Sequence, residues 1–415
     1  MLHKTLAGLS AGLMLGTIAG GAMAADLVIY HNWSSGPEVA ALNVLKADFE
    51  AKGHTWTDIA IPHDTGSNVS LINLITGGNP PNVFLESNPG VYRDLKQLGM
   101  DRPLTEFMEA NGILEHYPSS VIASIKVDGE VYKVPTGIHI DGMLYYSKAV
   151  AEKAGVNPEA WTSLDDMFAD FDKISAAGFI PIAIGGQQWQ VGYLTHALAA
   201  AVGGAEFYNN VYGAEPSLEA LSSDDMRNLL DWLRRFQQAA DEGSINREWN
   251  LTTNMVITGQ ALMQIHGDWM KGEFVAAGQK AGVDFGCEQI PGAKAVPVTV
   301  DSWGVLGGQP EAIDAAELDF VATVADPQVQ ADFAAQKGST PTRLDAPKDV
   351  LDACSTAVLS YLEDPDHQVQ NPHSMVDADW QSSIWDVVFN FWSDPEMSVD
   401  DAIAEMEENY DIILG

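Results

Sequence analysis

The sequence predicts an α/β fold with two domains, each built on a mostly parallel sheet flanked by helices. Short apolar runs alternate with segments of helical spacing, first near the N-terminus and again after residue 142. Such alternation is typical of parallel sheets that are covered on both faces. The chain has 415 residues, of which 46% are hydrophobic. Because a single core stops growing at about 250–300 residues, this length favours two cores.

The first domain is predicted from three apolar runs, interpreted as buried strands, and two helical segments between them. In chain order these are 26–30, 38–51, 57–61, 67–75 and 82–85. Ligands of parallel sheets bind beyond the carboxyl ends of the strands. The polar residues that follow the three runs are therefore candidates for a site: His31, Asn32 and Trp33, then His63 and Asp64, then Glu86 and Ser87.

A hairpin and a crossing between the domains are predicted next. Asp128 and Gly129 form a strong turn signal between the runs 124–127 and 131–134, and residues 135–137 follow as the crossing. The second domain then has a strand at 142–146, a helix that ends at 154, a segment at 161–176 and a strand at 180–184. We expect residues 281–305 to be extended and to lead back to the first domain. The part after 347 is predicted to be mainly helical.

The first 24 residues have the three parts of a secretory signal peptide. Lys4 provides a positive charge, residues 6–18 are apolar, and Ala22–Ala24 has the small-x-small pattern that signal peptidase requires. The apolar run is shorter than the about 20 residues that a membrane span needs, and no later run is long enough. We therefore expect cleavage near Ala24, export to the periplasm and no insertion into a membrane.

The chain is strongly acidic, since 58 Asp and Glu against 21 Lys and Arg give a formal net charge of −37. The acids are scattered and do not form one tail. Such a surface repels phosphate backbones and anionic lipid, which excludes nucleic-acid binding. It is typical of a solvated surface suited to a salty habitat, where screening weakens self-repulsion.

The chain has two cysteines, Cys287 and Cys354. Two cysteines in an exported protein are predicted to form a disulfide, although two buried free thiols are the alternative. The bridge would add roughly 4 kcal/mol of stability in the chain-entropy model. There is no third cysteine and the ten histidines are dispersed, so we expect no metal site and no cofactor.

Tryptophans provide the evidence for a ligand, because several of the 11 lie in polar, glycine-bearing segments where a core side chain would be poorly placed. These are Trp33, Trp189, Trp269 and Trp303. A sugar presents an apolar C–H face and a rim of hydroxyls, which suits a flat ring beside carboxylates and amides. Each of the four has such neighbours. We therefore predict a carbohydrate site, with packing at a domain edge as the alternative for any one of them.

Four carboxylates could instead provide the acid and base of a glycoside hydrolase: Glu38, Glu86, Asp268 and Asp301. No recognisable catalytic signature accompanies them, so we predict that the protein is not an enzyme. A scaffold or adhesion module is a further alternative, and it would show no stabilisation by sugars.

Four motifs carry a resemblance to a known family: Gly185–Trp189, Gly267–Phe274, Val300–Ser302 and Lys337–Arg343. Together they resemble the extracellular solute-binding proteins of carbohydrate ABC importers, and within these the glucose/mannose-binding branch. The likeness covers nearly the whole mature chain and includes both cysteines. It implies the two-lobed periplasmic binding protein fold, in which lobes joined by a multi-strand hinge close on one sugar. The implied lobes are 25–136 with about 299–343, and 137–298 with about 344–415.

The resemblance also implies roles for individual residues. Trp33 and Glu38 match the aromatic ring and the carboxylate of the first loop that contact the sugar in that branch. Asp301, Lys337 and His373 match its later polar contacts. With the pocket wall and the strand ends added, the predicted ligand-binding residues are Asn32, Trp33, Glu38, Glu86, Trp189, Trp269, Asp301, Lys337 and His373.

The chain differs from that branch at three places. It has Asn32-Trp33 where the branch often has tandem Trp, Glu86-Ser87 where it often has Lys, and Ile140–Gly142 where it has a basic and an amide residue. Because of these differences, the alternative ligands are another hexose, a pentose, a polyol or a cationic amino sugar. We expect a neutral monosaccharide, glucose-like first, that a monomer binds and delivers to the permease subunits of an ABC importer.

Overall fold

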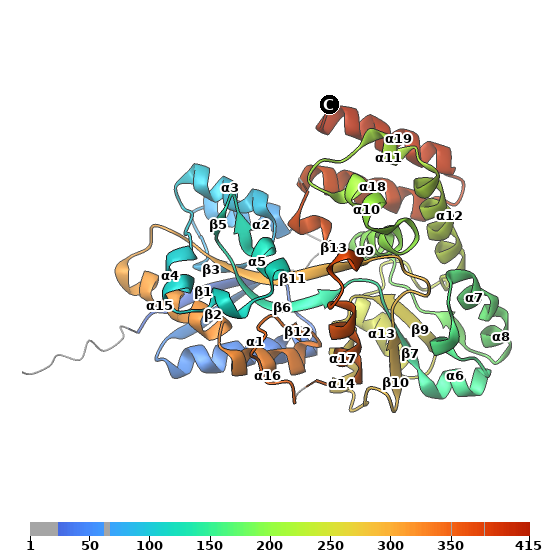
Figure 1. Cartoon of the computed structure of the whole chain (residues 1–415), viewed down its shortest axis with the longest axis horizontal. Coiled ribbons are helices and arrows are strands. Elements are labelled where there is room, and N and C mark those ends of the chain that lie inside the picture. Colours follow the sequence, from blue (N-terminus) through green and yellow to red (C-terminus); the bar gives the residue numbers. More distant parts are fainter. Residues whose placement is uncertain (1–23, 62–66, 350, 377) are drawn as a thin grey trace, which may run out of the picture.

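The computed structural model describes residues 24–61, 67–349, 351–376 and 378–415, which form two lobes side by side (Figure 1). The predicted signal peptide lies outside the described residues except for Ala24, and so do His63 and Asp64. Within the described ranges, no helix is long and apolar enough to cross a membrane.

The first lobe is built on a seven-stranded sheet in the order β12-β6-β11-β3-β1-β2, with β13 paired to β11. Its strands are β1 (Asp26–His31), β2 (Thr55–Ala60), β3 (Val83–Leu85), β6 (Val134–Ile140), β11 (Val296–Val305), β12 (Thr340–Pro341) and β13 (Gln368–Gln370). Its helices are α1 (Gly36–Ala51), α2 (Ser67–Thr76), α3 (Pro89–Leu98), α4 (Thr105–Ala110), α5 (Ser119–Ile125), α15 (Glu311–Val324) and α16 (Pro327–Lys337). A short 3-10 turn, η2, spans Leu114–His116.

The second lobe is built on a four-stranded sheet in the order β10-β7-β9-β8. Its strands are β7 (Met143–Ser147), β8 (Ile180–Ile182), β9 (Ala261–His266) and β10 (Phe285–Glu288). The earlier helices are α6 (Lys148–Ala154), α7 (Leu164–Ala169), α8 (Phe171–Ala176), α9 (Gln188–Leu198), α10 (Gly204–Tyr212), α11 (Leu218–Leu221) and α12 (Asp224–Ala239). The later ones are α13 (Trp249–Ile257), α14 (Met270–Ala276), α17 (Ala353–Tyr361), α18 (Ala378–Ser393) and α19 (Val399–Ile413). Short helical turns are η3 (Pro158–Ala160), η4 (Ala199–Gly203), η5 (Pro365–His367) and η6 (Pro372–Ser374).

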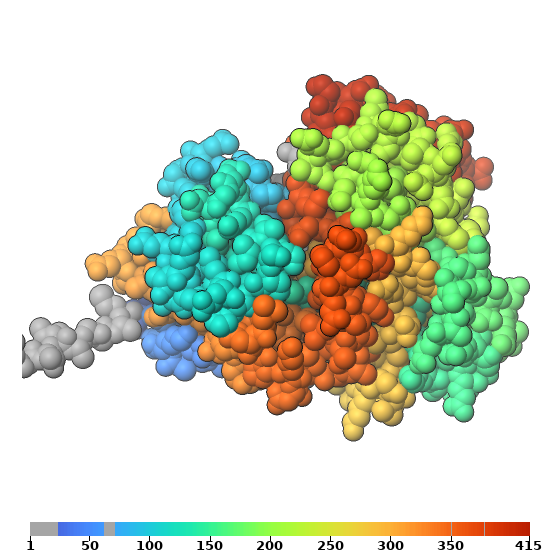
Figure 2. Space-filling model, in the orientation of Figure 1, coloured from blue at the N-terminus to red at the C-terminus, as the bar shows by residue number. Residues whose placement is uncertain are grey.

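Each lobe has its own apolar core. The largest buried cluster of the first lobe draws on 25–138 and 298–333, and that of the second on 144–295 and 369–406. The C-terminal third of the chain therefore contributes to both lobes. Figure 2 shows the blue-to-cyan and the green-to-lime segments as separate masses, with orange segments of the C-terminal third between them.

Both sheets are mixed, which corrects the expectation of mostly parallel pairing. β1 is parallel to β2 and β3, but β11 is antiparallel to β3 and β6. In the second lobe β8 is parallel to β9, whereas β7 is antiparallel to β9 and β10. The physical reason is the crossing of the chain between lobes: a strand that enters a lobe and one that returns run in opposite directions.

The predicted hairpin is shorter than expected. It consists of β4 (Lys126–Val127) and β5 (Glu130–Val131), because the residues before Lys126 belong to α5. Asp128 and Gly129 form its turn with φ angles of 50° and 91°. The predicted crossing at 135–137 lies inside β6, so the chain passes between the lobes as a strand.

The pairing of β6 with β11 contains an irregularity that α16 stabilises. Asp301 pairs with Gly137 but Ser302 pairs with Pro135, so the register shifts by one residue. Gln330 on α16 donates through Nε2 to the carbonyl of Pro135 at 2.9 Å, and its Oε1 accepts from the amide and the hydroxyl of Thr342. This fully buried amide thus satisfies polar groups that the bulge leaves outside the ladder.

The lobes also touch directly where α14 meets α1 and α16. A Cβ on Gly272 of α14 would lie 2.8 Å from Cβ of Pro37 and 3.0 Å from the carbonyl oxygens of Gln336 and Lys337. Only a glycine fits this approach without a shift of the neighbouring atoms. The contact brings the start of α1 and the end of α16 against the second lobe.

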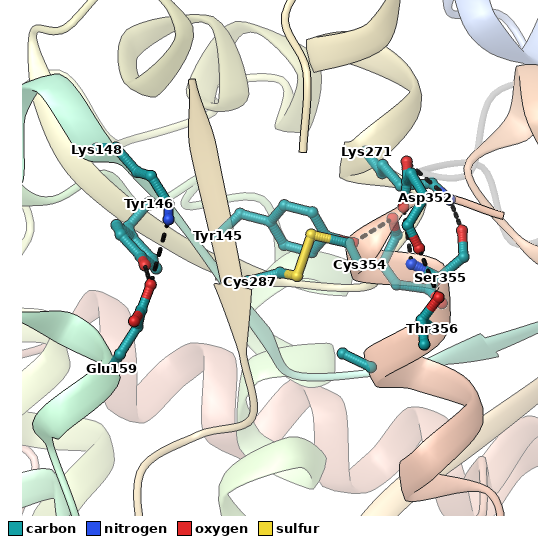
Figure 3. Close-up of a disulfide and its surroundings, with 12 residues drawn as sticks. Tyr145, Tyr146, Lys148, Glu159, Lys271, Cys287, Asp352, Cys354, Ser355 and Thr356 are labelled. Carbon is teal, nitrogen blue, oxygen red and sulfur yellow. Dashed lines mark hydrogen bonds and ion pairs between the residues drawn. A yellow bond between two sulfur atoms is a disulfide. The ribbon is translucent and has the colours of Figure 1, made fainter. Parts of the chain in front are cut away.

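The predicted disulfide is present. Cys287 on β10 is bonded to Cys354 at the start of α17, with a Cα–Cα distance of 5.8 Å (Figure 3). Nearby, Lys271 of α14 donates to the hydroxyl of Ser355, and its Nζ lies 3.6 Å from the carboxylate of Asp352 (Figure 3). The bridge and this polar cluster hold α17 on the sheet of the second lobe.

Replacing both cysteines by serine is expected to lower the free energy of unfolding by about 4 kcal/mol, because the bridge closes a loop with a sequence separation of 67. Urea denaturation of the double variant and the parent protein measures this difference. A loss below about 1 kcal/mol would contradict the loop-closure account.

Candidate ligand-binding cleft

A cleft of about 360 Å³ lies between the lobes and is lined by residues of both. All nine predicted ligand-binding residues line it: Asn32, Trp33, Glu38, Glu86, Trp189, Trp269, Asp301, Lys337 and His373. The volume is near the lower end of the range of about 300–1,000 Å³ that is usual for small-molecule sites. The structure therefore brings the whole predicted set to one place, whereas the contacts of these residues with a ligand stay predictions.

Glu38 is fixed by the N-terminus of α1. Ser35 caps this helix, and the backbone amides of Ser34 and Ser35 each donate to Glu38 Oε2 at 2.9 Å. This arrangement is a capping box, which the spacing Ser35-x-x-Glu38 already indicates in the sequence. The other oxygen, Oε1, lies 3.5 Å from Nζ of Lys337. Glu38 thus has a structural role beside its predicted role in the site.

Lys337 is held in the cleft between two aromatic rings. It is the last residue of α16, which Gly338 ends in the left-handed conformation with φ of 89°. Its ammonium group lies 5.0 Å from the ring centre of Trp33 and 5.6 Å from that of Trp269. Because the first ring belongs to one lobe and the second to the other, this buried cation contacts both walls of the cleft.

Glu86 follows β3 and is paired with His373 across the cleft. Its Oε1 accepts from the backbone amides of Ser87 and Asn88 at 2.8 and 2.7 Å, and from Nε2 of His373 at 2.7 Å. Burial of His373 lowers its pKa, but the charge of Glu86 and its hydrogen bond outweigh burial and raise the pKa above 6.5. Nearby, burial lowers the pKa of Lys133 to about 8, and its Nζ donates to the carbonyl of Ser87.

Asp301 is oriented by His139, a residue that the sequence analysis did not select. His139 on β6 donates through Nε2 to Asp301 on β11 at 3.1 Å, and through Nδ1 to Asp268 of the second lobe at 2.5 Å. Burial lowers the pKa of His139, yet the two carboxylates outweigh burial and raise it to about 9. A protonated imidazole therefore joins the hinge, the cleft and the second lobe.

His139→Gln is expected to remove a contribution to stability that depends on pH. A histidine whose pKa in the folded state lies above its unfolded value of 6.5 makes its full contribution to the stability of the fold below pH 6.5. That contribution is lost as the pH rises through about 9. The difference in free energy of unfolding between the parent and the variant should be about 3 kcal/mol larger below pH 6.5 than above about pH 9. Urea denaturation across this range measures it, and a difference that does not change with pH would contradict a charged His139.

A second buried carboxylate, Asp141, holds two more cleft residues. It accepts from Nδ2 of Asn371 at 2.7 Å and from the hydroxyl of Thr299 at 3.0 Å, and it lies 3.2 Å from Nε2 of His196. Asn371 and Thr299 both line the cleft. Asp141 thus places a carboxylate behind the site.

Aromatic side chains of the second lobe form one wall of the cleft. Trp189, Trp249 and Trp269 make a buried cluster against which Tyr193 and Trp385 pack. The ring centres of Tyr193 and Trp269 are 5.6 Å apart with planes at 81°, and those of Trp189 and Tyr193 are 5.7 Å apart at 84°. Tyr193, Trp249 and Trp385 also line the cleft and were not predicted from the sequence. The spacing of Trp189 and Tyr193, one turn apart on α9, is a signal that could have found Tyr193.

Trp303 corrects the expectation of a fourth tryptophan in the site. It lies in β11, is fully buried and packs edge-on against Trp33 and Phe320, with both ring distances 5.5 Å. Its polar sequence neighbours, Asp301 and Ser302, belong to the strand and not to a loop. Trp303 is a core residue of the first lobe that supports the ring of Trp33.

Comparisons with known proteins show the family. A family model described as bacterial extracellular solute-binding protein matches residues 44–356. A probable sugar-binding periplasmic protein of Brucella melitensis biotype 1 is 31% identical over 395 residues, which cover 92% of this chain and 91% of that protein. The chain belongs to the bacterial extracellular solute-binding proteins.

Solved structures confirm the two-lobed periplasmic binding protein fold of this solute-binding protein. A chitin oligosaccharide binding protein has a TM-score of 0.81 at 17% identity, over 94% of this chain and 98% of that one. A bacterial solute receptor, described as having an exclusive preference for b-D-galactopyranose, has a TM-score of 0.81 at 15% identity, over 94% and 100%. These two structures show the fold, and the glucose/mannose branch stays a prediction.

The carboxylates considered for hydrolysis are held by neighbouring cationic side chains. Asp268 does not line the cleft, and Glu38, Glu86 and Asp301 are each paired with a cationic side chain. Among the described residues there is also no group of three or more His, Cys, Asp or Glu that could hold a metal ion. The solute-binding protein thus offers aromatic surfaces and fixed polar groups, which suit binding.

Proposed function

We propose that the protein is the periplasmic sugar-binding component of an ABC importer and that it delivers a monosaccharide to the permease subunits. The observation that carries this proposal is the cleft, in which tryptophan rings of both lobes and fixed carboxylates of the first lobe surround about 360 Å³. A sugar matches it, because rings cover its C–H face and carboxylates accept from its hydroxyls. Membership of the solute-binding family and the name of the Brucella relative support it.

We propose that the ligand is a single sugar unit, and a glucose-like monosaccharide is the first choice. The cleft is at the small end of small-molecule sites, which favours a short ligand over a long chain. The fold alone does not set the size, since one neighbour in structure is a chitin oligosaccharide binder and another is described by its preference for a galactopyranose. A polyol and an amino sugar are the alternatives that the binding screen below separates.

In the proposed mechanism the lobes close on the sugar as a hinged trap. The first moving lobe consists of residues 25–136 with about 299–343, and the second of residues 137–298 with about 344–415. The protein acts as a monomer. Closure exchanges the water around each hydroxyl for a fixed side-chain partner, and micromolar affinity requires about −8 kcal/mol. The closed form would present both lobes to the permease, so that docking reports an occupied site.

A thermal-shift screen of the mature protein tests the class of ligand. The panel contains neutral sugars, amino sugars, polyols and short oligosaccharides. A ligand at about 100 times its dissociation constant should stabilise the folded state by about 2.7 kcal/mol, which raises the melting temperature visibly. A shift with a monosaccharide supports the proposal. No shift with any carbohydrate would contradict it, and product analysis after incubation with oligosaccharides would then test for hydrolysis.

Trp33→Ala and Asp301→Ala are each expected to weaken binding of the sugar found in the screen by at least about 30-fold, because each removes a central contact. Isothermal titration calorimetry measures the affinity. Trp232→Ala is the matched control, since Trp232 is a partly buried tryptophan of the second lobe that packs under Arg235 outside the cleft. Unchanged affinity in a folded Trp33→Ala or Asp301→Ala variant would overturn the assignment of the site.

A further inference from the structure

Side chains at one edge of the cleft are almost completely covered. Trp33 and Lys337 of the first lobe are each 3% exposed and Trp269 of the second lobe is 9% exposed, although all three line the cleft. The ammonium group of Lys337 lies 5.0 Å from the ring centre of Trp33 and 5.6 Å from that of Trp269. The two lobes therefore cover each other here. A sugar that stacks on either ring gains access most directly when the lobes separate at this edge.

Beside these residues, α14 packs against the ends of α1 and α16. Gly272 of α14 lies one turn after Trp269 and does not line the cleft. A Cβ on Gly272 would lie 2.8 Å from Cβ of Pro37 and 3.0 Å from the carbonyl oxygens of Gln336 and Lys337. Two of these three obstacles are backbone atoms, which cannot rotate away. A side chain at this position would therefore act on the distance between the lobes and not on the ligand itself.

Formation of this contact has an electrostatic cost. The next residue of α14, Glu273, is half-buried where the lobes meet. Burial raises the pKa of Glu273 above 4.5, and the charge of Glu38 adds to this effect. A hydrogen bond with Ser35 and the charge of Lys337 lower the pKa by a smaller amount. A raised pKa means that the contact disfavours the ionised carboxylate, so at neutral pH the contact needs another source of stability. A sugar held by both lobes can provide it.

We propose that Gly272 is a positioning residue for ligand binding: its lack of a side chain lets α14 close on α1 and α16 when a sugar binds. In the sugar-free protein this contact is open. The residue thus acts through Trp269 and Trp33, because closure at Gly272 brings the two rings to their places in the cleft. This inference rests on the proposed function.

Gly272→Ala separates a contact of the closed form from a permanent one. Alanine is a better helix former than glycine, so α14 itself is not weakened. If the contact is open without sugar, the new Cβ meets no atom of the first lobe, and the sugar-free variant should melt at the temperature of the parent or above. In the closed form the Cβ overlaps its neighbours. The affinity for the sugar found in the screen should therefore fall at least about 10-fold.

Two results would overturn the proposal. A lower melting temperature of the sugar-free Gly272→Ala variant would show that the contact is permanent, because the overlap would then be present without ligand. Unchanged affinity would show that closure does not depend on this approach. Isothermal titration calorimetry and thermal melting provide the two measurements. If the parent protein binds no carbohydrate, the proposed function fails before any variant is made, so the two failures are distinguishable.

Gly36→Ala is the matched control. Gly36 is an exposed glycine at the start of α1, and a Cβ there would have no neighbouring atom within 4 Å. The substitution has the same chemistry at the same edge of the molecule but creates no overlap. Neither the affinity nor the melting temperature is expected to fall.

A distance measurement without any change at Gly272 keeps the proposal testable if the variant does not fold. Val39 on α1 and Val275 on α14 are 44% and 42% exposed, so spin labels on cysteines at these positions avoid the packed contact. The native cysteines are bonded to each other and do not react. Electron paramagnetic resonance should show that the sugar shortens the distance between the labels by more than about 2 Å. A distance that the sugar leaves unchanged would overturn the proposal.

Discussion

The antiparallel pairing of β6 with β11 is the constraint on which the rest of the structure depends. Both strands belong to the sheet of the first lobe, and β6 leads directly into β7 of the second. They also carry His139, Thr299 and Asp301, so the strands that connect the lobes contribute polar groups to the cleft and its support. The polar groups of the cleft and the connection between the lobes therefore share one piece of backbone. The buried side chain of Gln330 holds this piece in place at its bulge.

Pairing of buried charges is the second principle of the site. An unpaired charge in a protein interior is costly, and removing one partner leaves the other uncompensated. The cleft satisfies this condition with residues from different elements, because no single helix or strand supplies both members of the pairs formed by Asp301, Glu86 and Lys337. The pairs fix the orientation of the carboxylates before a ligand arrives, which reduces the entropy that binding must overcome.

Much of the site could be predicted, for identifiable reasons. Trp33 and Glu86 follow strands of a parallel pair, and the carboxyl ends of such strands converge at one edge of the sheet. The prediction for Trp303 was wrong because a polar stretch inside a long strand has the composition of a loop. Trp249 and Trp385 reach the cleft from helices of the second lobe, so no local pattern distinguishes them from core tryptophans.

The sequence by itself determined the α/β class, the order of the main elements and the acidic surface. These depend on composition or on periodicity within a few residues. Asp301, Lys337 and His373 were predicted from the resemblance of motifs, and the structure places all three in the lining of the cleft. Only the tertiary structure decided the mixed strand directions and which cation compensates which carboxylate. His373 and Glu86 are 287 residues apart, and His139 and Asp301 are 162 apart. Contacts at such separations arise from the path of the chain between the lobes, and a local pattern contains no information about that path.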